Sequence, residues 1–242
     1  MANSTEILLL TASVDPAASK TPFTHLLDPK LRLQEYLQNI KRIIEEGVFE
    51  KIVFCENTNY NYDYSEIVRF AKSKNVELEP LVFEGNYEKI SHQGKGYGEG
   101  QIIKYAIMNS KLLLPDSVFY KLTGRIFIRN IASIVRKNKA KEVIFIRAQR
   151  KVRIVDARFF KTSVAFFKAH LMEEFVNVND PEKHYLEMVY FEKLQTINGI
   201  SRFNEFPYFM GVSGSTGKKY DQSLYEYLKY SLLLKAGFLN IR

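Results

Sequence analysis

Cysteine is almost absent from this 242-residue sequence, which contains only Cys55. A disulfide within the chain is therefore excluded. Because Cys55 lies in the apolar run 51–55, we expect a buried thiol and neither a nucleophile nor a metal ligand. The four histidines lack the spacing of a zinc site, and no Cys-x-x-Cys occurs. These shortages argue against a structural metal.

Long apolar runs are also missing. The run 7–10 is too short for a signal peptide or a membrane span, and no positively charged segment precedes it. We therefore expect a cytoplasmic protein. The chain lacks a Pro- or Gly-rich linker, an internal repeat and a low-complexity tract. This predicts one domain over residues 1–242.

The composition that remains is typical of a folded protein, with 46% hydrophobic and 26% charged residues. The net charge of +8 favours contact with polyanions, which include nucleotide phosphates, nucleic acids and anionic membrane surfaces. Basic residues crowd together only in the segment 147–158. That segment is either a localised anion site or a solvated basic face.

Apolar runs alternate with amphipathic segments in the first half, as in β-α units that build a mostly parallel sheet. The pattern predicts strands at 6–11, 51–55, 76–83 and 118–122, with helices at 29–47, 64–74 and 98–113. The alternation fades after residue 124. There we predict strands at 142–147 and 152–160, then helices at 163–175, 183–196 and 222–236. The fold class is α/β.

Candidate binding residues follow the predicted strands, because ligand sites of open α/β sheets form beyond the carboxyl ends of the strands. The residues concerned are Thr11, Ala12, Glu56, Thr123, Gly124 and Arg125, together with Lys95, Gly98 and Glu99 of the loop before the third helix. We expect them to converge on one edge of the sheet.

The loop 94–99 and Arg125 suit phosphate. Glycines let backbone amides approach an anion, Lys95 adds positive charge, and a guanidinium matches phosphate oxygens. The loop fits neither the Walker pattern nor the dinucleotide fingerprint. The alternatives are a flexible turn in which Glu99 caps the helix, and a surface arginine after a turn glycine.

Two carboxylates are candidates for proton transfer. Asp156 lies between arginines in an apolar segment, where it either meets a ligand or pairs with a neighbour such as Arg158. Glu187 borders the buried stripe of its helix and could accept a proton from a hydroxyl, although a solvated glutamate fits the pattern as well. Ser213 and Ser215 lie in a small-residue loop that is either a diphosphate or acceptor loop or a plain turn.

Taken in order, seven segments resemble GT-A-type glycosyltransferases of bacterial capsule and lipopolysaccharide O-antigen assembly. They are residues 32–36, 53–57, 95–99, 121–125, 155–160, 185–187 and 213–217. The resemblance implies a GT-A-like, Rossmann-like fold with a mixed, mostly parallel sheet flanked by helices. It implies a hexosyltransferase-like enzyme that moves a sugar from a nucleotide-sugar donor, UDP-sugar being favoured, to a saccharide or lipid-linked saccharide. Residues 1–124 would bind the donor and residues 125–242 would form the acceptor side.

The resemblance departs from the family at its metal site. Many GT-A enzymes bind a divalent metal through Asp-x-Asp, but this sequence contains no such motif and has 123–125 at the corresponding place. We therefore expect positive side chains to stabilise the leaving diphosphate, and Mn²⁺ or Mg²⁺ is the less favoured alternative. The lipid-linked acceptors of the family and the basic charge imply weak peripheral contact with the inner face of the plasma membrane.

Two other functions remain open at this stage. The positive charge and the abundant aromatic residues fit a protein that binds or modifies nucleic acid, but the sequence has no recognised nucleic-acid motif and no long basic stripe. A catalytically silent scaffold subunit of a polysaccharide assembly complex is the third possibility. We favour the glycosyltransferase and expect no nucleic-acid partner.

Overall fold

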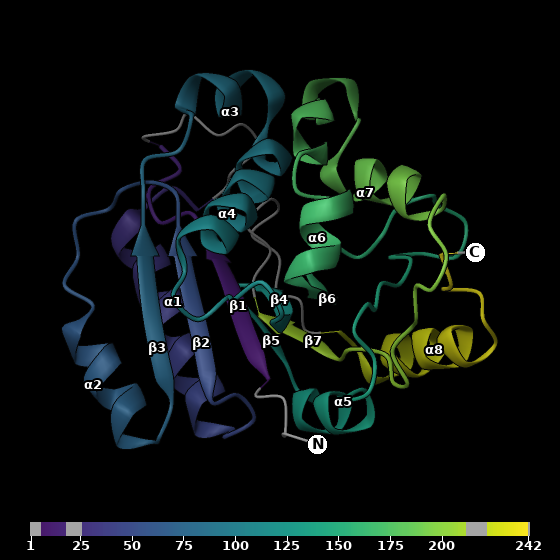
Figure 1. Cartoon of the computed structure of the whole chain (residues 1–242), viewed down its shortest axis with the longest axis horizontal. Helices are drawn as coiled ribbons and strands as arrows, with labels where there is room; N and C mark the ends of the chain where they lie inside the picture. The colour runs from purple at the N-terminus through teal and green to yellow at the C-terminus, as the bar shows by residue number, and fades with distance from the viewer. Residues whose placement is uncertain (1–5, 18–25, 212–221, 242) are drawn as a thin grey trace.

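A five-stranded sheet forms the centre of the computed structural model, which describes residues 6–17, 26–211 and 222–241 (Figure 1). The strand order is β3-β2-β1-β4-β6, with β1 to β4 parallel and β6 antiparallel to β4. The strands are β1 (Ile7–Ala12), β2 (Lys51–Glu56), β3 (Glu77–Val82), β4 (Val118–Thr123) and β6 (Phe159–Ser163). The predicted α/β class, with a mostly parallel sheet flanked by helices, is confirmed.

Helical crossovers join the parallel strands. Between successive strands lie α1 (Pro29–Glu45), then α2 (Ser65–Ser73), then the pair α3 (Tyr87–Gln93) and α4 (Lys95–Asn109). Neighbouring residues fix the start of α1. The Asp28 side chain caps the helix by accepting the backbone N–H of Lys30 at 2.8 Å, and proline occupies the first turn. Three strand-helix-strand units therefore precede residue 124, as the apolar periodicity predicts.

The alternation of side chains along β1 divides the core into two layers. Leu8 and Leu10 face the apolar cluster that contains α1 and α2, whereas Ile7 and Leu9 face the cluster that contains α4. Figure 1 shows α4 in front of the strands and α1 behind them. Both clusters also include residues from beyond position 124, so the two halves of the chain share one core.

The second half extends the sheet and adds smaller elements. These are β5 (Ile126–Ile128), α5 (Ile131–Lys137), α6 (Val164–His170), the 3₁₀ helices η1 (Glu174–Asn177) and η2 (Asp180–Glu182), α7 (Leu186–Leu194), β7 (Phe209–Gly211) and α8 (Leu224–Lys235). Strands β5 and β7 pair antiparallel in a separate two-stranded sheet. Helices α6 and α7 contribute to the same apolar cluster as α4.

Of the two strands predicted in the second half, 142–147 is wrong and 152–160 is right only for its last two residues. Segment 142–147 makes isolated bridges, in which Ile144 pairs with Lys161 and Ser201 and Arg147 pairs with Val155. Segment 152–160 is mostly irregular, because β6 begins only at Phe159. Ile144 and Val155 are fully buried all the same. Apolar residues of these segments are buried in the core individually, without forming a continuous β-strand.

The helices differ from expectation in three places. Helix α4 runs from Lys95 to Asn109, whereas residues 98–113 were expected. The seven-residue helix α3 was not predicted; it is started by Asn86, whose side chain accepts the N–H of Lys89 at 3.0 Å. The predicted helix 163–175 ends at His170 and is followed by the separate 3₁₀ turn η1. Short elements of this kind carry too little periodicity to be read reliably from a sequence.

Candidate active site

A large cleft opens where the connections of the sheet change direction. From β1 the chain crosses to β2 on one side, whereas β4 lies on the other side of β1, which makes the carboxyl ends of β1 and β4 a switch point. The cleft there has a volume of about 1040 Å³. Ligand pockets usually measure about 300–1,000 Å³, so this one has room for a ligand of several rings.

Most of the residues predicted for the site line this cleft. They are Thr11, Ala12, Lys95, Gly98, Glu99, Thr123, Arg125, Asp156, Arg158 and Glu187. Of the described residues predicted for the site, Glu56 and Gly124 do not line it. Ser213 and Ser215 lie outside the described residues. The predicted convergence on one edge of the sheet is thus observed, and the roles of the residues remain predictions.

Glu56 supports the turn after β2. Its carboxylate accepts the hydroxyl and backbone N–H of Thr58 and the N–H of Tyr60, the last at 3.3 Å. Burial raises the pKa of Glu56 above its usual value. These contacts occupy the side chain within the turn.

Gly124 brings the end of β4 close to β1. Its N–H donates to Thr11 O at 2.9 Å, and an added Cβ would lie 2.8 Å from that oxygen and 3.0 Å from the Tyr36 ring. Any larger residue would push the two strands apart. Gly124 is therefore needed for the close approach of β4, β1 and the Tyr36 ring at this edge of the sheet.

A buried cation lies beneath the cleft. Lys121 is completely buried in β4, pairs with Glu99 and donates to Ala157 O at 2.7 Å. The same Glu99 oxygen accepts the hydroxyls of Thr11 at 3.3 Å and Thr123 at 3.2 Å. Glu99 thereby ties the ends of β1 and β4 to the first turns of α4. We did not select Lys121 from the sequence, although a lysine inside an apolar strand was a signal for a paired charge.

Glu187 lies in the first turn of α7 and lines the cleft, half-buried. Burial raises the pKa of this carboxyl to about 7, and the negative charges of Glu99 and Asp180 contribute to the rise. The backbone oxygen of Glu187 accepts the N–H of Val155 at 3.0 Å, which fixes the start of α7 against segment 152–158. A carboxyl with a pKa near neutrality is suited to accept a proton from a bound hydroxyl.

Asp156 is buried and is held by Arg158. The guanidinium donates from Nε to one carboxylate oxygen at 2.9 Å and from Nη2 to the other at 2.7 Å. Arg158 also stacks on the ring of Phe209 at 3.9 Å. This fork-to-fork pair corresponds to the structural alternative for Asp156, because both of its oxygens already accept hydrogen bonds.

Two buried arginines line the wall near β1. Arg125 pairs with Glu35 at 2.7 Å, and Arg32 donates to Ser13 O at 2.8 Å. Both guanidinium groups lie about 6 Å from the ring of Tyr36. Arg32 belongs to a segment that carries the family resemblance, but we did not select it as a site residue. Arg32 lies in α1, far in sequence from the ends of the strands, and the candidate residues were sought directly after the strands.

The glycine-rich segment is helical, not a loop, since α4 begins at Lys95. Gly94 has a φ of +99°, and an added Cβ there would lie 2.3 Å from an oxygen of Asp180. The carboxylate of Asp180 accepts the N–H of Gly96 at 3.2 Å. The glycines therefore allow close packing at the start of α4, and Asp180 occupies one of the amides that we expected to meet a phosphate.

The described residues were searched for a metal site and for a helix that could span a membrane. Across residues 6–17, 26–211 and 222–241, no three His, Cys, Asp or Glu side chains gather closely enough to hold a metal ion. None of the helices in the described part of the chain has the length and apolar content of a bilayer span.

Comparison with known proteins yields a distant likeness in fold. No protein-family model matches the chain, and no curated protein matches its sequence. Among solved structures, it is similar to one from Bacillus anthracis that is assigned as a glucose-1-phosphate thymidylyltransferase, in complex with sucrose. The identity is 10%, the alignment covers 96% of this chain and 94% of that chain, and the TM-score is 0.49. The likeness concerns the overall fold and says nothing about the reaction of this protein.

Proposed function

We propose that this protein is a glycosyltransferase that moves a sugar from a nucleotide-sugar donor, with UDP-sugar favoured, to a saccharide acceptor of a bacterial surface polysaccharide. One observation carries the proposal: the cleft at the switch point joins a buried cationic wall to a carboxyl whose pKa is near neutrality. Such a transfer requires a group that takes a proton and positive groups that stabilise the departing diphosphate.

The donor is proposed to lie across the ends of β1 and β4, with residues 1–124 supplying most of its contacts. Thr11, Ala12, Gly98 and Lys95 line this part of the cleft beside Arg125. The guanidinium of Arg125 is the better phosphate ligand, because its planar fork matches two oxygens at once. Arg32 adds a second buried cation on the same wall. No Asp-x-Asp is present, so we propose that these cations replace a metal.

In the proposed reaction, Glu187 accepts the proton of an acceptor hydroxyl. The hydroxyl oxygen bonds to the anomeric carbon while the bond from that carbon to the diphosphate oxygen breaks. The diphosphate leaves with the electron pair, and Arg125 and Lys95 stabilise its charge. We prefer Glu187 to Asp156 as the base because Arg158 occupies both oxygens of Asp156. Asp156 then positions Arg158 on the acceptor side.

We also propose that the acceptor is a lipid-linked saccharide at the inner face of the plasma membrane, with the protein on the cytoplasmic side. The lipid-linked acceptors of the resembled family and the net charge of +8 support this. The cleft is large enough to receive a saccharide beside the donor.

A thermal-shift screen of UDP, GDP, CMP and dTDP compounds tests the donor. A ligand present at one hundred times its dissociation constant should stabilise the fold by about 2.7 kcal/mol. We expect a shift with a UDP-sugar that persists in EDTA. A shift that appears only with Mn²⁺ would reject the metal-free scheme.

Product analysis with the donor so identified tests the reaction. Release of free nucleoside diphosphate together with a glycosylated acceptor supports glycosyl transfer. Release of pyrophosphate from a nucleoside triphosphate and a sugar 1-phosphate would assign the cleft to nucleotidyl transfer instead. Salt-sensitive binding of RNA or DNA without any nucleotide-sugar binding would support a nucleic-acid protein.

A further inference from the structure

Helix α8 presents a stripe of large apolar side chains to solvent. The side chains of Leu224, Tyr225, Leu228 and Leu232 are 62%, 75%, 51% and 67% exposed, respectively. The three leucines follow one another at intervals of four residues, so they lie on one face of the helix. Contiguous exposed apolar residues of this kind mark an interaction surface, whereas single ones are common.

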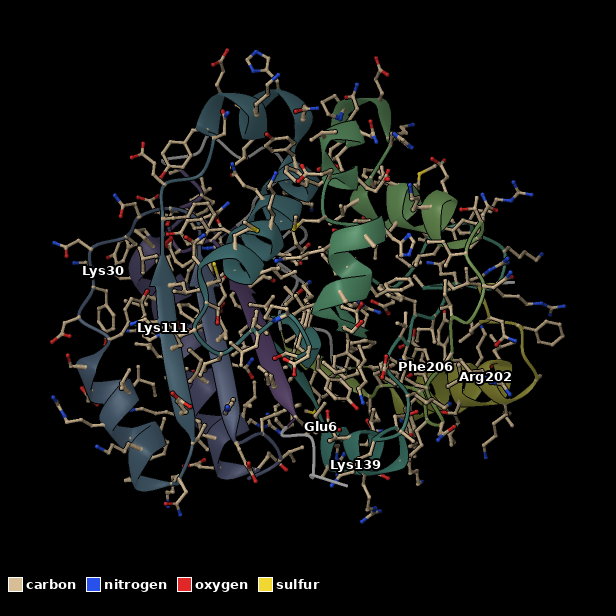
Figure 2. The ribbon with its side chains drawn as sticks, in the orientation of Figure 1. Glu6, Lys30, Lys111, Lys139, Arg202 and Phe206 are labelled. Atoms are coloured by element: carbon tan, nitrogen blue, oxygen red, sulfur yellow. The ribbon has the colours of Figure 1, made fainter. Side chains whose placement is uncertain are left out.

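The other side of α8 is anchored to the domain. Leu234 is buried, Tyr230 stacks on Phe206 at a ring distance of 5.2 Å, and Arg202 donates to the backbone oxygen of Leu234. Figure 2 shows Arg202 and Phe206 beside this helix. Glu226 and Tyr230 line the cleft. The anchoring therefore fixes which face is left uncovered by the described residues, and that face is the leucine stripe.

Two exposed lysines lie on the same helix as the stripe. Lys229 and Lys235 are exposed on α8 itself, and its only acidic residue, Glu226, belongs to the N-terminal capping box. Beyond the helix, Phe238 is 43% exposed and carries the guanidinium of Arg150 at 3.9 Å from its ring. This contact places Arg150, the first residue of the exposed stretch 150–153, close behind the C-terminal end of α8.

We propose that this surface binds an anionic lipid bilayer, with the α8 stripe buried among the acyl chains and the flanking cations at the headgroups. Exposed leucines beside lysines supply the two groups that a membrane interface binds, an apolar surface for the acyl boundary and cations for anionic headgroups. Tyrosine is favoured at that depth because its ring is apolar and its hydroxyl is polar. The exposed lysines Lys229 and Lys235 complement the negative charge of anionic headgroups, so the chemistry favours an anionic lipid surface over a neutral apolar partner.

The same helix connects this surface to the cleft. Glu226 and Tyr230 line the cleft on one side of α8, while Leu228 and Leu232 point outward from another. A bound bilayer would therefore lie one helix diameter from the cleft. If the proposed glycosyl transfer holds, this is where the headgroup of a lipid-linked acceptor would enter. The lipid surface itself does not depend on that reaction.

Sedimentation of the full-length protein with phosphatidylcholine vesicles, with or without 30 mol% phosphatidylglycerol, tests the proposal. We expect binding to the anionic vesicles that weakens with added NaCl. The pair Leu228→Ser and Leu232→Ser should lower the partition coefficient by about 30-fold, because exposed leucines no longer enter the acyl region. The pair Lys229→Ser and Lys235→Ser should lower it by about 25-fold, since each basic residue contributes about fivefold near an anionic surface.

The matched control is the pair Met108→Ser and Leu114→Ser; these residues are 58% and 52% exposed, the first in the last turn of α4 and the second in the segment that follows it. This control should bind vesicles like the unchanged protein. Equal binding by the leucine pair and the control would overturn the proposal. So would a concentration-dependent dimer that the leucine pair abolishes without any change in vesicle binding. Donor binding by thermal shift should survive in the leucine pair, so failure of the lipid surface and failure of the proposed reaction can be told apart.

Discussion

Replacement of Glu187 by glutamine separates the proposed catalytic role of this residue from its effect on stability. The pKa of the Glu187 carboxyl is raised from 4.5 to about 7 in the folded protein, chiefly by burial. At about 1.36 kcal/mol per pH unit, such a rise amounts to about 3 kcal/mol. Because the side chain also faces the open cleft, solvent screens part of this, and we expect about 1–3 kcal/mol.

The direction in which the free energy of unfolding changes with pH follows from proton linkage. Below pH 4.5 the carboxyl is protonated in both the folded and the unfolded chain. As the pH rises from 4.5 to about 7, the unfolded chain releases this proton while the folded protein retains it, so the free energy of unfolding falls. Above about pH 7 the loss is complete. Glu187→Gln removes the titration, so this variant should be more stable than the unchanged protein at pH 8 and no more stable near pH 4.5.

Urea unfolding at pH 4.5, 6, 7 and 8 measures the difference, and thermal unfolding should show a rise of about 2–4 °C per kcal/mol. The variant should at the same time lose about a hundredfold or more of turnover with donor affinity retained. The turnover of the unchanged enzyme should fall below about pH 7, where Glu187 becomes protonated.

The matched control is Glu192→Gln on the same helix, whose side chain is 55% exposed. An exposed change of this kind should alter stability by less than about 0.5 kcal/mol. The reasoning is refuted if Glu187→Gln destabilises the protein at pH 8, or if its stability differs from that of the unchanged protein by the same amount at every pH. Full turnover in the variant would remove Glu187 from the reaction.

Three further changes test the site and its packing. Arg125→Ala should weaken donor binding about 10- to 100-fold in calorimetric titration, because a charge-assisted contact contributes about 1.5–3 kcal/mol. Lys121→Met should lower the free energy of unfolding by about 3–5 kcal/mol, since Glu99 loses its buried partner, and the further change Glu99→Gln should recover part of that loss. Gly100→Ala should cost about 1–3 kcal/mol in thermal unfolding, because an added Cβ would lie 2.1 Å from Cβ of Phe175.

Each of these three predictions can be contradicted by a specific result. For Arg125, the control is Arg136→Ala on the exposed side of α5, and equal donor affinity in the two variants would remove Arg125 from the donor site. For Lys121, additive losses in the double variant would mean that the pair with Glu99 contributes nothing. For Gly100, an unchanged melting temperature would mean that η1 can move away from α4.

The predictions from the sequence match the structure best for elements that are defined by neighbouring residues. The first four strands and α1, α2 and α4 follow the apolar periodicity, and the cap at Asp28 is a matter of a few neighbouring residues. The sheet edge was predictable too, because parallel strands joined by right-handed crossovers must end on the same side. Thr11, Ala12, Thr123 and Arg125 therefore line one cleft, and six further predicted site residues, from α4, α7 and the segment before β6, line it too.

The elements of the second half were predicted less accurately, because its buried residues do not recur at the period of a strand or a helix. Ile144 and Val155 are in the core without belonging to a ladder, so an apolar run there did not mean a strand. The predicted loop 94–99 is helical from Lys95, and Asp180, about 80 residues away in the chain, packs against Gly94 and Gly96 at its start. No local pattern contains that information.

The sequence alone determined that this chain has an α/β fold and that arginine and carboxylate side chains stand near the carboxyl ends of its parallel strands, because strand and helix periods and chain connectivity are properties of neighbouring residues. Only the tertiary structure decided which charges are free to act. It pairs Asp156 with Arg158, buries Lys121 against Glu99, and leaves Glu187 at the cleft with a raised pKa. Burial, and the pairing of Lys121 with Glu99, depend on distances between segments remote in sequence, and those distances exist only after the chain has folded. Asp156 and Arg158 are neighbours in sequence, so their pairing was one of two alternatives that the sequence left open, and the folded chain shows the pair.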